Sequence, residues 1–105
     1  MGNVANTNTW NGTGLKFAVT MTCEGFDMDE DDWNIKVRRG TKEIIFTREN
    51  SIQDEGGQWY ICVDTTLLGP GIIYIIFEAL VPDTDFNGGV RKEIQKYELI
   101  YNKSL

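Results

Sequence analysis

The acidic stretch Glu24–Asp32 is the part of the sequence whose residue types could bind a metal ion. Three of its aspartates alternate with the spacing that opens an EF-hand calcium loop: Asp27, Asp29 and Asp31. Calcium needs several hard oxygen ligands, but the sixth position of this loop is Asp32 instead of glycine and the twelfth is Arg38 instead of glutamate. We therefore interpret the stretch as a solvated loop. A weak calcium site of another geometry is the alternative, and it is not favoured.

Paired carboxylates could hydrolyse a glycosidic bond if burial kept one of them protonated. The best candidates, Asp83 and Asp85, lie in a glycine-containing turn, where Asx-turn hydrogen bonds to the backbone explain both residues. The chain contains no histidine, so it lacks the commonest general base and the commonest zinc ligand. No serine or threonine stands in a nucleophile-elbow sequence. We predict that the protein is not an enzyme and that it needs no cofactor.

The two cysteines, Cys23 and Cys62, leave two interpretations open. With Trp33 and Tyr60 they loosely resemble the Cys, Trp and Tyr-x-Cys pattern of an immunoglobulin domain, in which the two thiols pair. The other interpretation is two buried free thiols that act as small apolar side chains. We favour free thiols because the first 14 residues, MGNVANTNTWNGTG, show no secretory signal, and disulfides belong to oxidising compartments.

Aromatic side chains on a sheet face can bind sugars, and Trp10 and Trp59 are the candidates for such an aromatic surface. Trp59 alternates with polar residues in a predicted strand, so a position in the core is the simpler interpretation. Trp10 lies in a polar segment and is the one tryptophan whose burial the strand pattern does not imply.

The charge balance argues against two classes of partner. The chain has 10 basic and 16 acidic residues, which gives a formal net charge of −6. Nucleic-acid-binding proteins neutralise phosphates with clustered Lys and Arg, and anionic membranes attract the same residues. We expect neither nucleic acid nor a membrane as a partner. The longest apolar run, Ile72–Phe77, has the length of a strand and not of a membrane span.

The elements that must position these residues are β-strands. Apolar residues alternate with polar ones over residues 15–21, 33–37 and 59–63, which is the period of a half-buried strand. Ile72–Val81 is apolar at nearly every position, as in a central strand that is covered on both faces or partly by a partner. Val90–Tyr101 alternates again.

A chain of 105 residues has room for one hydrophobic core. We predict that residues 1–13 form a flexible or edge-docking arm and that residues 14–105 form a single domain. The fold class is all-β, an immunoglobulin-like β-sandwich of about seven antiparallel strands.

Two stretches resemble known families. Residues 68–74 (LGPGIIY) are similar to the L-x-P-G-x-x-Y corner of fibronectin type III and bacterial immunoglobulin-like domains, where the tyrosine hydroxyl can bond back to the corner's backbone. The same LGPG strand, followed by residues 82–93 (PDTDFNGGVRKE), resembles structural proteins of Bacteroidetes phages and prophages, including the N-terminal domain of baseplate upper proteins. The resemblance runs from residue 15 to residue 101. It implies an immunoglobulin-like sandwich in a tail, baseplate or fibre-associated assembly, without catalytic residues.

From this resemblance we expect a non-catalytic phage or prophage structural or assembly module. It would act through contacts with other protein subunits, identical or different, in the virion or in the host cytoplasm during assembly. The candidate interaction loop has four members: Asp83, Asp85, Phe86 and Arg91. We expect Arg91 to pair with Asp83 or Asp85 and so to fix the loop. The alternative is an extracellular immunoglobulin-like carbohydrate-binding or adhesin module that uses Trp10 or Trp59.

Overall fold

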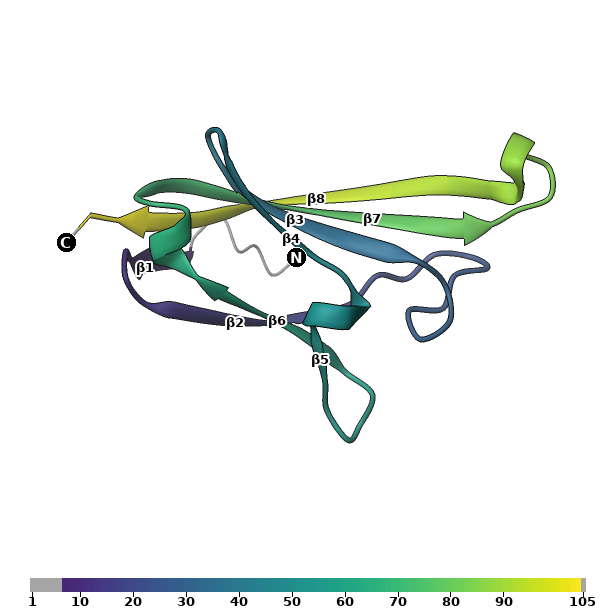
Figure 1. Ribbon diagram of the computed structural model, residues 1–105, viewed down its shortest axis with the longest axis horizontal. Coiled ribbons are helices and arrows are strands. Elements are labelled where there is room, and N and C mark those ends of the chain that lie inside the picture. The colour runs from purple at the N-terminus through teal and green to yellow at the C-terminus, as the bar shows by residue number, and fades with distance from the viewer. Residues whose placement is uncertain (1–6, 105) are drawn as a thin grey trace.

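Two β-sheets lie face to face in the computed structural model, which describes residues 7–104 (Figure 1). The larger sheet has the strand order β1-β8-β7-β3-β4 and the smaller sheet the order β2-β6-β5. The strands are β1 Thr7–Trp10, β2 Gly14–Val19, β3 Trp33–Arg39, β4 Lys42–Phe46, β5 Ile52–Gln53, β6 Trp59–Asp64, β7 Gly71–Pro82 and β8 Val90–Lys103. Short 3-10 helices join several of these strands: η2 Arg48–Asn50, η3 Thr65–Leu67 and η4 Asn87–Gly89. None of the described helices is long and apolar enough to cross a membrane.

The chain crosses repeatedly from one sheet to the other, as it does in an immunoglobulin-like sandwich. This arrangement confirms the predicted fold class. Residues 7–104 form eight strands, and one of their pairings is parallel, because β1 adds to the edge of β8. This strand lies in the segment that we predicted as an arm. Its end is also bonded beyond the strand, where Asn11 N donates to Lys103 O at 2.8 Å.

The core forms because one face of each main strand is apolar and turns toward the opposite sheet. Trp33 and Phe77 from the larger sheet meet Trp59 from the smaller one, with ring centroids 5.5 Å apart for the two tryptophans and 5.6 Å for Trp33 and Phe77. The outward residues of β7 are different. Ile72, on the outer face near the start of this strand, is 45% exposed, whereas the next four residues on that face are half-buried: Tyr74, Ile76, Glu78 and Leu80.

The corner before β7 is where the sequence predicts it, but its polar partners differ from the expected ones. Gly69 and Gly71 have positive φ angles of 82° and 132°, which favour glycine. Arg39 Nε donates to Leu68 O at 2.6 Å, and a Cβ on Gly71 would lie only 2.8 Å from Arg39 Cδ. Among the described residues no hydrogen bond joins the Tyr74 hydroxyl to the corner. Its ring instead faces Lys96, whose Nζ lies 5.0 Å from the centroid.

The β7–β8 hairpin is the longest element of the molecule and carries the candidate loop at its tip. Its pairs run from Gly71 opposite Asn102 to Pro82 opposite Val90, with an irregularity between Ile73 and Tyr74. The molecule measures 49 × 31 × 27 Å, and the far end of the hairpin projects beyond the smaller sheet (Figure 1). The tip is therefore at one extremity of the long axis.

Candidate functional site

The tip of the β7–β8 hairpin is a tight turn built on one aspartate. Asp83 Oδ1 accepts a hydrogen bond from Asp85 N at 3.0 Å, which is the Asx turn that the sequence predicts. The backbone closes around it, since Phe86 N donates to Asp83 O at 3.2 Å and Asp83 N donates to Gly89 O at 2.9 Å. These bonds give the loop one defined conformation.

Arg91 fixes this turn to the rest of the hairpin. Its Nη1 forms an ion pair with Asp83 Oδ2, and its Nε donates to Glu93 Oε2 at 2.7 Å. The predicted pairing with Asp83 is confirmed. Asp85, the alternative partner, contributes its backbone N–H to the turn and not its carboxylate. The hydrogen bonds to Glu93 and Asp83 raise the pKa of the Arg91 guanidinium. Arg91 Nη2 also donates to Glu24 O at 3.2 Å and so connects the tip to the acidic loop.

Phe86 is the apolar side chain that this turn presents. It is 48% exposed, and Val90 and Ile94 on β8 are 44% and 57% exposed. Val90 and Ile94 lie opposite Pro82 and Glu78, on the outer side of the hairpin, because the intervening positions face inward. The tip therefore combines a rigid backbone, exposed apolar side chains and carboxylates.

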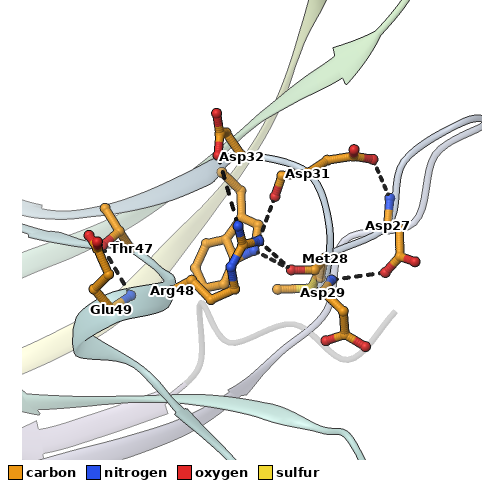
Figure 2. Close-up of polar contacts among 9 residues, drawn as sticks. Asp27, Met28, Asp29, Asp31, Asp32, Thr47, Arg48 and Glu49 are labelled. Atoms are coloured by element: carbon orange, nitrogen blue, oxygen red, sulfur yellow. Dashed lines mark hydrogen bonds and ion pairs between the residues drawn. The ribbon is translucent and has the colours of Figure 1, made fainter.

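Arg48 organises the acidic loop Glu24–Asp32, which lies beside the hairpin. Figure 2 shows its guanidinium surrounded by backbone of the loop. Arg48 Nη1 donates to Met28 O at 2.9 Å and to Asp31 O at 2.7 Å, and Nη2 lies 3.9 Å from Asp32 Oδ1. The sequence analysis missed this role, because Arg48 is 20 residues from Met28 and no local pattern marks it.

The three aspartates proposed for calcium accept hydrogen bonds from the protein itself. Asp27 Oδ1 accepts from Asp29 N and Asp31 Oδ2 accepts from Asp27 N, each at 2.9 Å (Figure 2). Asp29 Oδ1 accepts from Trp59 Nε1 at 3.0 Å and from Gln53 Nε2 at 2.8 Å. Within residues 7–104 no three His, Cys, Asp or Glu side chains are grouped to hold a metal ion. These contacts give the aspartates a structural role in shaping the loop.

The structure does not place Trp10 and Trp59 on a common aromatic surface. Trp59 lies in the core, which was the simpler interpretation of its strand pattern: it is only 8% exposed because it faces inward on β6 and packs against Trp33. Trp10 is 49% exposed at the opposite end of the molecule from the hairpin tip, and Lys103 Nζ lies 5.4 Å from its ring centroid.

Both cysteines are free thiols, as we favoured, but they are not both buried. Cys62 is exposed because Ile61 and Val63 occupy the inward positions on either side of it. It lies on β6, which pairs with β2 in the smaller sheet, so it does not occupy the position of the second immunoglobulin cysteine. Cys23 is half-buried, and its pKa is raised by burial and then by Glu93.

Comparison with known proteins gave no relative: no family model, curated protein or solved structure matches the chain. Arguments about function therefore depend on the geometry described above.

Proposed function

We propose that this chain is a non-catalytic β-sandwich module that acts through protein–protein contacts made by the tip of the β7–β8 hairpin. In line with the resemblance described above, we propose that these contacts join it to a phage or prophage assembly of the tail, baseplate or fibre type.

The observation that carries this proposal is Phe86, an aromatic side chain that is 48% exposed on a turn held by Asp83 and Arg91. An exposed aromatic on a preorganised loop loses little conformational entropy when a partner covers it, and buried aromatic anchors dominate the energy of many interfaces. The tip carboxylates support a contact role over a catalytic one, since Asp83 is bonded through both oxygens.

The test places a photo-crosslinking phenylalanine analogue at position 86 and expresses the protein in its native host. The control carries the same analogue at Glu55, which is exposed in the turn between β5 and β6. We expect a covalent adduct with a protein from position 86 and none from position 55. If light gives no adduct at position 86, the hairpin tip is not the contact site. A tryptophan fluorescence response to sugars without an adduct would instead favour the adhesin alternative.

A further inference from the structure

Charge is strongly separated along the long axis of the molecule. The loop 20–32 and the hairpin tip 82–91 lie at one end (Figure 1), where Leu80 N donates to Asp32 O at 2.9 Å and Arg91 reaches Glu24 O. These two segments hold eight carboxylates and one guanidinium: Glu24, Asp27, Asp29, Glu30, Asp31, Asp32, Asp83, Asp85 and Arg91. The Arg48 guanidinium, which bonds the loop from η2, brings the formal charge of this acidic end to −6.

The opposite end has an excess of positive charge. It comprises the turn between β3 and β4, the corner at η3, and the ends of β1 and β8 (Figure 1). Four basic residues against two acidic ones give a formal charge of +2: Arg38, Arg39, Lys42 and Lys103 against Glu43 and Asp64. We call this the basic end.

Exposed apolar side chains follow the same division. Of the nine large apolar side chains that are exposed within the described part of the chain, three lie on the tip or the adjoining half of β8: Phe86, Val90 and Ile94. Four lie at the basic end: Trp10, Leu67, Ile72 and Tyr101. Each end therefore combines a net charge of one sign with exposed apolar side chains, which is the composition of an interaction site more than of a solvated surface.

At the basic end, three of these side chains share the outer face of the larger sheet. Ile72 lies opposite Tyr101, and Trp10 lies opposite Lys103. Because Ile100 and Asn102 are fully buried, the alternating residues of β8 turn outward. The face thus offers an aliphatic and two aromatic side chains, bordered by an ammonium group.

We propose that the acidic end of one copy docks on the basic end of a second copy, head to tail. This inference rests on the proposed function and names a second copy as the partner of the hairpin tip. Phe86 would be covered by Trp10, Ile72 and Tyr101, while the opposite charges attract and orient the two copies. The two ends are different surfaces, so the contact is heterologous. Each added copy leaves one free end of each kind, and the assembly grows as a chain or closes as a ring.

Two half-blocked variants test the pairing. The first reverses exposed charges at the acidic end, Glu30→Lys with Asp85→Lys, and the second reverses charges at the basic end, Lys42→Glu with Lys103→Glu. None of these four side chains is bonded to Arg91 or Arg48 in the structure. A control changes the charge between the two ends, with Lys96→Glu, an exposed residue that lies opposite Ile76 in the middle of the β7–β8 hairpin. Circular dichroism verifies that each variant is folded.

Light scattering then measures the mass. In low salt, we expect the average mass of the unmodified protein and of the control to rise with concentration above the 11.9 kDa of one chain. The dissociation constant should rise by roughly tenfold or more between 50 and 500 mM salt, because exposed charges are screened. The basic-end variant, which carries net negative charge at both ends, should remain monomeric alone. The acidic-end variant should associate more weakly than the unmodified protein, and the equimolar mixture of the two should give mainly dimers, since one intact interface remains.

The proposal is overturned if the unmodified chain stays monomeric at millimolar concentration in low salt, or if the mixture stays monomeric. It is also overturned if the basic-end variant associates as tightly as the unmodified protein, because attraction between opposite charges then does not hold the two copies together. If the chain is monomeric but still crosslinks to a different protein through position 86, the head-to-tail self-association is refuted and the proposed function is not. Absence of any adduct at position 86 contradicts the proposed function.

Discussion

Replacing Arg48 by methionine removes the guanidinium that holds the acidic loop while keeping an apolar stem of similar length. The variant loses the bonds from Nη1 to Met28 O at 2.9 Å and to Asp31 O at 2.7 Å. Hydrogen bonds from a charged donor contribute about 1.5–3 kcal/mol each when buried. Three facts reduce the sum: the side chain is 34% exposed, ordering an arginine costs up to about 2 kcal/mol, and Met28 O keeps its bond to Trp33 Nε1 at 2.8 Å. We expect a net loss of about 1–2 kcal/mol in the free energy of unfolding.

Urea unfolding followed by far-UV circular dichroism measures this loss. At an unchanged m value of about 2 kcal/mol/M, the midpoint should fall by roughly 0.5–1 M. The matched control is Arg38→Met, which breaks an exposed ion pair with Glu43 and should change stability by less than about 1 kcal/mol. In 0.5 M salt the Arg48 effect should persist, since its main partners are neutral carbonyls, whereas the Arg38 effect should vanish. Equal losses in the two variants, or the disappearance of both in salt, would refute the assigned role of Arg48.

Two further predictions concern titratable groups. Burial alone would raise the pKa of Glu78, but the hydrogen bonds from Lys36 and Asn34 lower this pKa overall. The ionised Glu78 therefore stabilises the folded protein fully above the ordinary glutamate pKa of about 4.3, and this contribution is lost as the pH falls through the lowered value. Unfolding measured from pH 6 to pH 3 should be less pH-dependent in Glu78→Gln than in the unmodified protein, and identical slopes would contradict this assignment. In the folded, unreduced protein, an aromatic disulfide reagent should titrate two thiols. Cys62 should react faster than Cys23, because Cys62 is exposed and the pKa of Cys23 is raised. Finding no free thiol would contradict the structure.

Local patterns in the sequence predicted the features that depend on neighbouring residues. Alternation along β3 and β6 identified which side chains face the core, because the pleat of a strand has a period of two. The Asx turn and the pairing of Arg91 with Asp83 were also predicted, since a tight hairpin brings residues eight apart in the chain to the same place.

Features that depend on packing between distant segments could not be predicted. β1 was predicted only as part of a flexible or edge-docking arm, without its partner, and its parallel pairing is with β8, the last strand of the chain. Asp29 was considered as a metal ligand, although it accepts a hydrogen bond from Trp59, 30 residues away. The outward position of Cys62 depends on strand register, which the spacing of two cysteines does not determine.

The sequence by itself determined the all-β class and the net charge of −6, because both depend on composition and on short-range periodicity. Only the tertiary structure decided where the charge lies. The acidic loop and the hairpin tip are about 50 residues apart in the chain, and packing of the loop beside β7 and β8 brings their carboxylates to one end of a 49 Å molecule. Long-range contacts determine such a separation of charge, since no rule of local conformation relates the positions of two loops.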